Sequence, residues 1–156
     1  MRVISAVFLL LLHSSAWAED AGKLLGNWKL VSFYTEDVNT KQRNDVFGAN
    51  PSGAIGFTPG RFYAFVVAGN RKAPQTPEEQ AAAYRTILAY TGKWRLEEGK
   101  FITTVDIAWD PAWVGTDQVR YWKVDGNKLS IVSAPFPNPN VAGAMVIGTL
   151  VWERQQ

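Results

Sequence analysis

KFITTVDIAWDPAWVGTDQVRYWKVDGNKLSIVSA, residues Lys100–Ala134, alternates short runs rich in β-branched and aromatic residues with turn sequences. Three strands are predicted within it, at Lys100–Trp109, Asp117–Val124 and Lys128–Ala134. The last two flank an Asp-Gly-Asn turn at residues 125–127, and Asp-Gly between two such runs is a strong hairpin signal. Strands that follow one another as hairpins favour an up-and-down meander.

Runs of the same kind lie on both sides of this stretch. Five more strands are predicted, at Gly26–Thr35, Ser52–Thr58, Arg61–Ala68, Lys93–Glu97 and Gly143–Arg154. About eight short strands with regular turn signals indicate an all-β fold, and we predict an up-and-down β-barrel with one inserted α-helix. A closed barrel also leaves no sheet edge open to pairing with other chains.

The inserted helix is predicted from a strong start signal. Thr76 can cap it, Pro77 suits its first position, and Glu79 completes a capping box. We expect the helix to run to about Tyr90. One face would carry Ala81, Tyr84, Ile87 and Leu88. An apolar face predicts packing, so the helix is expected to lie against another surface, at a length that would cross one end of the barrel.

The first residues have the pattern of a secretory signal peptide. A positive start at Arg2 precedes an apolar run over residues 3–12, and Ala16-Trp17-Ala18 is a small-x-small cleavage site. The apolar run is too short to span a bilayer. We therefore predict a signal peptide at residues 1–18, a single barrel domain at residues 19–156, and a periplasmic or secreted location.

The scarcity of cysteine and histidine limits the kinds of catalytic and metal sites that the chain can form. The chain has no cysteine and one histidine, His13, which lies in the expected signal peptide. Catalytic Ser-His-Asp and Cys-His arrangements, thiolate zinc sites and histidine-ligated metals are therefore not expected in the exported domain, and neither is a cofactor. Without Arg2 the charge is 15 basic minus 14 acidic residues, or +1, with no basic block, so no nucleic-acid partner is expected.

Three motifs together resemble one family. These are the G-x-W at Gly26–Trp28, the run DPAWVGTDQVRYW at Asp110–Trp122, and VWER at Val151–Arg154. In this order they are similar to the bacterial and fungal lipocalin-like domain family, whose pattern P-x-x-x-G-x-x-Q-x-R falls on Gln118 and Arg120. The resemblance implies a calycin-type barrel in which Arg154 lies across the Trp28 ring as a structural closure, not as a ligand site.

The direction of Asp106 and Arg120 stays open at this point. Residues two apart share one face of a strand, but the sequence does not say which face is inside. In one interpretation Asp106 and Arg120 face water as a cross-strand ion pair. In the other, Gln118, Arg120 and Trp122 point into the barrel with Asp106 and Thr104 opposite them, forming the polar floor of a ligand cup. The resemblance favours the second.

The pattern and the resemblance together favour a protein that binds a small apolar or amphipathic molecule inside the barrel. The candidate ligand-binding residues are Arg120, Asp106, Gln118, Trp122, Thr104, Tyr63 and, at the rim, Trp109 and Trp113. An alternative is a non-metal isomerase or cyclase with Asp106 as general acid or base, Arg120 tuning it and Tyr63 as proton donor. A third is an envelope interaction protein whose barrel is filled by side chains.

Overall fold

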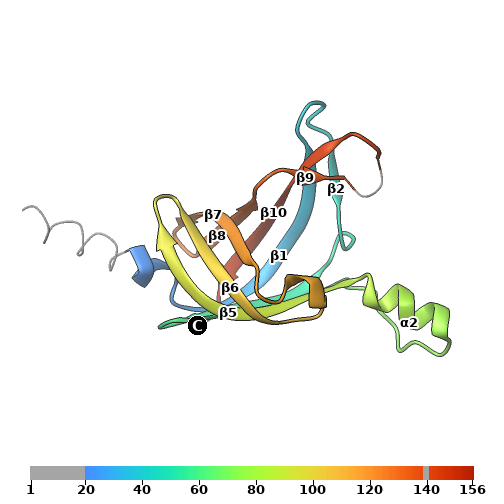
Figure 1. Ribbon diagram of the computed structural model, residues 1–156, viewed down its shortest axis with the longest axis horizontal. Coiled ribbons are helices and arrows are strands. Elements are labelled where there is room, and N and C mark those ends of the chain that lie inside the picture. Colours follow the sequence, from blue (N-terminus) through green and yellow to red (C-terminus); the bar gives the residue numbers. More distant parts are fainter. Residues whose placement is uncertain (1–19, 139–140) are drawn as a thin grey trace, which may run out of the picture.

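Eight antiparallel strands close into a barrel in the computed structural model, which describes residues 20–138 and 141–156 (Figure 1). The barrel strands are β1 (Gly26–Asp37), β3 (Ser52–Thr58), β4 (Arg61–Val67), β5 (Ile87–Glu97), β6 (Lys100–Ala108), β7 (Asp117–Asp125), β8 (Lys128–Ser133) and β10 (Met145–Arg154). From β3 to β8 each strand pairs with the next one in the chain. The predicted all-β meander barrel is confirmed.

Shorter elements extend this frame. Strand β2 (Arg43–Asp45) pairs with β1, and β9 (Phe136–Pro137) pairs with β10. Residues 20–24 are helical, α2 covers Pro77–Tyr84, and the 3-10 turn η1 covers Pro111–Trp113. Among the described residues no helix is long and apolar enough to cross a membrane. The predicted signal peptide at residues 1–18 lies outside the described part of the chain.

The barrel closes where the first and last long strands meet. Strand β1 pairs antiparallel with β10, with Trp28 opposite Arg154 and Asp37 opposite Val146. The backbone N–H of Gln155 also donates to the carbonyl of Asn27 at 2.9 Å. Both ends of the domain therefore belong to one continuous wall.

The inserted helix begins where predicted, but the prediction of its end is wrong. The Thr76 hydroxyl accepts a hydrogen bond from the Glu79 N–H at 3.2 Å, and the helix ends at Tyr84. Residues 87–90 instead begin β5, because there they pair with β4. No residue of α2 is buried, and the helix projects away from the barrel (Figure 1), so the expected packing across the barrel end is not formed.

The core is densest near the end where the chain enters β1. Phe57 contacts Phe62, Trp94 and Phe101 at ring-centroid distances of 4.8, 5.1 and 5.2 Å. Aromatic pairs at such separations contribute about 0.5–1.5 kcal/mol each beyond the area they bury. Trp28 and Trp152 are almost fully buried beside them. This end of the barrel is filled, so open interior space lies toward the other end.

Candidate functional site

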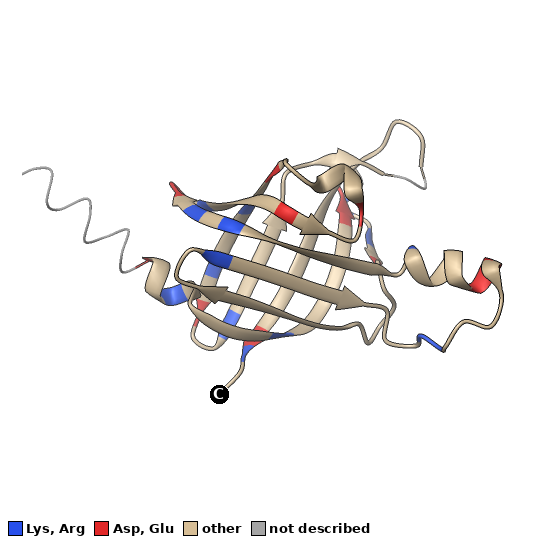
Figure 2. Ribbon diagram, turned by 60° about the horizontal axis from the view of Figure 1, so that its bottom comes forward, with Lys and Arg blue, Asp and Glu red and all other residues tan. Residues whose placement is uncertain are grey.

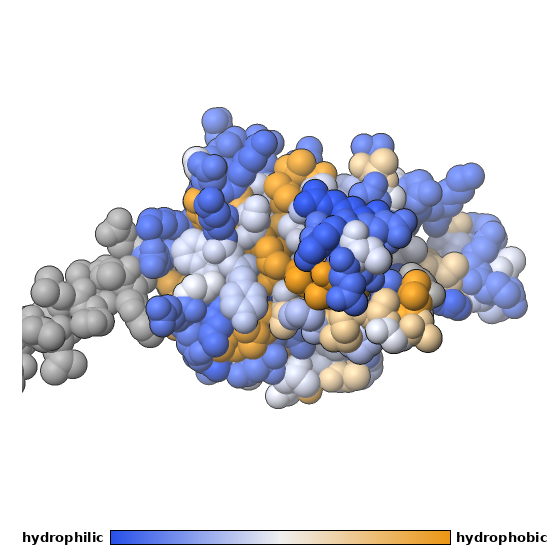
Figure 3. Space-filling view, turned by 90° about the horizontal axis from the view of Figure 1, so that it is seen from above, coloured by the Kyte–Doolittle hydropathy of each residue, from blue (hydrophilic) through white to orange (hydrophobic). Residues whose placement is uncertain are grey.

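A cavity of about 780 Å³ occupies the barrel interior. This volume is typical of small-molecule sites, which span roughly 300–1,000 Å³. Apolar side chains form most of its wall, among them Phe33, Ile55, Phe62, Leu88, Phe101 and Trp152. Seen from above, apolar side chains lie between hydrophilic groups on this side of the molecule (Figure 3). The interior is therefore not filled by side chains, and the filled-barrel interpretation loses its basis.

Trp28 and Arg154 seal the other end as the resemblance implied. The Arg154 guanidinium carbon lies 4.0 Å from the centroid of the Trp28 ring. Its two terminal nitrogens donate to the carbonyls of Leu25 at 2.8 Å and Lys23 at 2.6 Å, and the Trp28 indole donates to the carbonyl of Leu24 at 2.9 Å. The predicted stacking contact is present and ties the N-terminal segment to the last strand.

Register decides which way the β7 side chains point. Arg120 stands opposite Phe101 of β6, and Gln118 stands opposite Thr103. Phe101 and Thr103 are 0% exposed. Because directly paired residues of antiparallel strands share a face, Gln118 and Arg120 point inward, and both line the cavity.

A chain of hydrogen bonds holds Arg120 in place. Its guanidinium donates to the carbonyl of Val119 at 2.8 Å and to the side-chain oxygen of Gln118 at 3.0 Å. The Gln118 amide donates in turn to the Thr116 hydroxyl, at 3.0 Å. The guanidinium also lies 5.9 Å from the ring centroid of Trp113. Arg120 is therefore positioned by the loop that contains η1.

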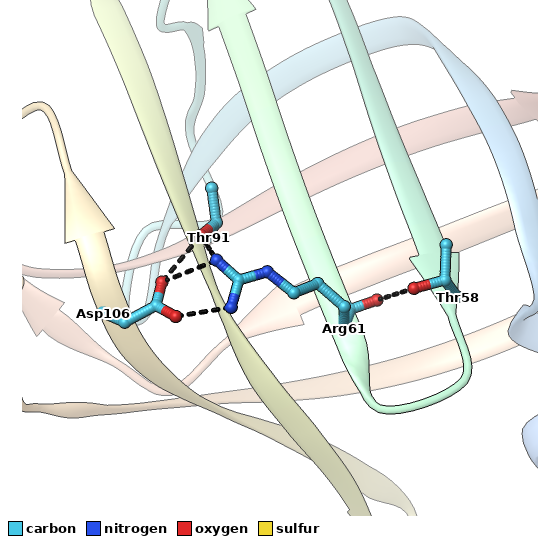
Figure 4. Close-up of polar contacts among 4 residues, drawn as sticks. All are labelled: Thr58, Arg61, Thr91 and Asp106. Atoms are coloured by element: carbon cyan, nitrogen blue, oxygen red, sulfur yellow. Dashed lines mark hydrogen bonds and ion pairs between the residues drawn. The ribbon is translucent and has the colours of Figure 1, made fainter.

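Asp106 lies on the outer face, so the predicted inward pair with Arg120 is wrong. Its carboxylate accepts from Arg61 at 2.6 and 3.1 Å and from the Thr91 hydroxyl at 2.7 Å (Figure 4). Thr91 and Arg61 hold the pKa of this carboxyl below its ordinary value. The ion pair is about half exposed. Asp106 also sits at an irregularity in the pairing of β5 with β6, where Thr91 pairs with Ile107 but Gly92 pairs with Val105.

Thr104 and Tyr63 also face outward, contrary to the ligand-cup prediction. The Thr104 hydroxyl donates to Asp117 at 2.6 Å, and Arg95 binds the same carboxylate at 3.0 Å. The hydroxyl of Tyr63 donates to the side-chain oxygen of Asn27 at 2.5 Å. These bonds lie outside the barrel wall. The general acid, the tuning arginine and the proton donor of the isomerase hypothesis are therefore not brought to one site.

The three tryptophans predicted to bind a ligand do not all line the cavity. Trp109 and Trp113 line the cavity beside η1, with ring centroids 4.9 Å apart. Trp122 points inward opposite Ile131 and packs against the core, and its buried indole nitrogen has no hydrogen-bond partner among the described residues. The two rim tryptophans are placed to contact a cavity ligand.

Two cavity residues escaped the sequence reasoning. Tyr90, 5% exposed, was assigned to the end of the helix although it belongs to β5, and its ring contacts Trp113 at 5.3 Å. Trp152 lines the cavity from β10. Trp152 stands two residues before Arg154, so strand alternation and the closure motif together could have placed it inside.

Charge is spread thinly over the barrel, and Figure 2 shows most of the wall without charged residues. Within residues 20–138 and 141–156 no group of three or more His, Cys, Asp or Glu side chains is arranged to hold a metal ion. The polar groups of the cavity lining are of two kinds: Asp45, Arg85 and Asp117 are exposed, whereas Arg120, Gln118 and Tyr90 are half-buried or buried.

Comparison with known families agrees with the geometry. The profile of the lipocalin-like domain family matches residues 25–155. Comparisons with curated proteins and with solved structures found no match. The matched span contains all eight barrel strands, the Trp28–Arg154 closure and the lining of the cavity. The chain belongs to the lipocalin-like domain family.

Proposed function

We propose that this protein binds a small apolar or amphipathic molecule in the barrel cavity. The observation that carries the proposal is the apolar-walled interior space of about 780 Å³, sealed at one end and bearing few polar groups. Transfer of apolar ligand surface from water into such a cavity contributes about 25 cal/mol per Å². A preformed site also avoids part of the ordering cost of binding.

The proposal includes export. Residues 1–18 have the order of a signal peptide, with a positive start, an apolar run and a small-x-small cleavage site. The binding protein would therefore work in the periplasm or outside the cell. Mass spectrometry of the protein recovered from the exported fraction tests this, because the proposal requires a chain that begins at Glu19.

Binding is tested by titrating the purified protein with neutral probes, a hydrophobic dye and a long-chain alcohol, while following tryptophan fluorescence. Trp109, Trp113 and Trp152 line the cavity, so occupancy should change their emission. Saturable binding at one site per chain is expected. Failure of both probes to bind up to their solubility would refute the proposal.

A matched pair of variants locates the binding. Ala64 lines the cavity, whereas Ala89 pairs directly with the exposed Phe65 and so faces outward. Ala64→Phe is expected to fill part of the cavity and weaken binding of both probes. Ala89→Phe adds the same side chain to the outer wall and should leave binding unchanged. Equal effects of the two variants would place the ligand elsewhere.

A further inference from the structure

Arg120 carries a positive charge into the cavity without a carboxylate to balance it. It is half-buried, and no acidic side chain of the described chain forms an ion pair with it. A guanidinium has five N–H donors, and only two bonds are formed here, both to neutral oxygens. The remaining donors are available to a ligand that enters the cavity.

The acidic side chains that could have paired with Arg120 are bound by other residues or face away from it. Asp117 of the same strand borders the cavity, but its exposed carboxylate is held by Arg95 and Thr104. Asp45, which also borders the cavity, is exposed and forms no ion pair with Arg120. Asp106, which could have been the counter-ion, is bound by Arg61. By comparison, Arg154 at the sealed end uses two carbonyls and an indole ring. Of the charged residues that line the cavity, Arg85, Asp45 and Asp117 are exposed, whereas Arg120 is half-buried and has no carboxylate partner among the described residues.

A second donor lies beside it. Tyr90 is 5% exposed, lines the cavity, and its hydroxyl has no hydrogen-bond partner among the described residues. Tyr90 and Arg120 both adjoin the Trp113 ring, at 5.3 Å between ring centroids and 5.9 Å from the guanidinium carbon. Burial raises the pKa of Tyr90, and the positive charge of Arg120 partly opposes this. A phenolic hydroxyl that lines a cavity and has no partner in the chain can donate to an acceptor on a ligand.

Both donors are near the end that carries η1. Trp113 of η1 contacts the Tyr90 ring and lies under the Arg120 guanidinium. On the side of the sealed end, Ile55 pairs with Trp28, and Phe62 and Phe101 pack on Phe57 of the core. The polar floor expected from the sequence is not formed, because Asp106 and Thr104 face outward.

We propose that the ligand is an apolar carboxylic acid whose carboxylate binds Arg120 and Tyr90 while its apolar body extends toward the sealed end. The proposal rests on the binding function above and adds the ligand's charge and orientation. A carboxylate fits because it presents two oxygens to the planar guanidinium fork. Arg120 is the half-buried cation of the lining, since Arg85 is exposed, so a single negative charge matches it, whereas a phosphate dianion would leave charge unbalanced in a largely apolar space.

The test compares hexadecanoic acid with hexadecan-1-ol, which share a chain and differ in the charged head group. Dissociation constants are measured at neutral pH for the wild-type protein and for Arg120→Met, Tyr90→Phe and Arg61→Met. The Arg120→Met variant keeps a similar side-chain length and loses the charge. The Arg61→Met variant removes an arginine of the outer face and serves as the control.

The wild-type protein is expected to bind the acid about tenfold or more tightly than the alcohol, because charge-assisted hydrogen bonds are the strong ones. Arg120→Met should abolish this preference without weakening the alcohol, and Tyr90→Phe should reduce it. Arg61→Met should retain it in full. If Arg120→Met does not fold, the wild-type preference and Tyr90→Phe still decide.

Other outcomes separate the two proposals. Equal affinity of the wild-type protein for acid and alcohol would overturn the carboxylate assignment and leave the binding function standing. The same holds if Arg120→Met weakens both probes equally, since the arginine would then only support the fold. If neither hexadecanoic acid nor hexadecan-1-ol binds to the wild-type protein, both proposals are overturned.

Discussion

Arginine side chains on this barrel differ in what surrounds them. Arg61 meets a carboxylate at the exposed outer wall, Arg154 meets carbonyls and a ring at the sealed end, and Arg120 meets only neutral oxygens in the cavity. The Arg61 ion pair is screened by water, and surface ion pairs of this kind add little stability. Arg154 joins segments that are distant in the chain. Arg120 keeps N–H donors that no group of the described chain accepts. The three arginines therefore differ in role because they differ in position on the barrel.

Arg154→Ala is expected to lower the free energy of unfolding by about 2–4 kcal/mol, because two charge-assisted bonds and a cation–π contact are lost together. The free energy of unfolding of Arg154→Lys should lie between those of the wild-type protein and Arg154→Ala, since an ammonium group cannot reproduce the planar fork of the guanidinium. Urea unfolding followed by tryptophan fluorescence gives these values. Arg43→Ala is the control, because it loses an ion pair with Glu36 and a stacking contact with Tyr34 but no bond between distant segments, and it should cost less. A loss for Arg154→Ala no larger than that of the control would contradict the clamp.

The closure pair could be predicted from the sequence, whereas the partner of Asp106 could not. Trp28 and Arg154 are marked by motifs at the two ends of the barrel. Strand alternation correctly grouped Gln118 with Arg120, but it cannot show which residues of β6 stand opposite them. That register pairs Arg120 with Phe101, so Arg120 faces in while Asp106 faces out. Each of the two interpretations was therefore right about one of the two residues.

Strands β5 and β6 show how an element departs from its local pattern. Residues 87–90 fit a helical apolar face, yet they form β5 because their backbone groups pair with β4, and three of them, Ile87, Leu88 and Tyr90, line the cavity. Local periodicity cannot distinguish these outcomes over so few residues. The pairing irregularity at Asp106 is equally invisible in sequence, and it turns Ile107 outward, where it is 63% exposed.

Gly92 makes the close approach of β5 and β6 possible. A Cβ at this position would lie 2.1 Å from the carbonyl oxygen of Thr104, which is backbone and cannot rotate away. Gly92→Ala is therefore expected to cost about 3 kcal/mol or more in unfolding free energy, measured by urea unfolding. Gly148→Ala is the matched control, because its nearest atom would be 3.5 Å away. Equal stability of the two variants would show that the strands can separate without penalty.

Three surface carboxyl groups have pKa values below their ordinary values in the folded protein. The pKa of Asp37 is lowered by the backbone N–H groups of Thr40 and Asn39, that of Asp117 by Thr104 and Arg95, and that of Asp106 by Thr91 and Arg61. A carboxyl with a lower pKa in the folded state than in the unfolded state stabilises the fold above the unfolded value. That contribution is lost as the pH falls through the folded value.

The melting temperature is accordingly expected to be nearly constant between pH 5 and pH 8 and to fall below about pH 4, where unfolded carboxyls take up protons. The chain's single histidine is His13, so residues 19–156 contain no imidazole to titrate near neutrality. Calorimetry across the pH range measures this profile. Asp106→Asn should make the acid limb shallower. A stability step between pH 6 and pH 7 would contradict the assignment.

Pairing of β1 with β10 joins residues that are far apart in the chain, such as Phe33 and Leu150. Contacts of such long sequence separation form slowly, because the entropy of closing the intervening loop opposes them before any packing is gained. Synthesis also delivers β10 last, so the barrel cannot close while its final residues are still missing. The barrel therefore stays unclosed until synthesis is complete. This agrees with the proposed export, because a chain that has not yet folded can cross a membrane.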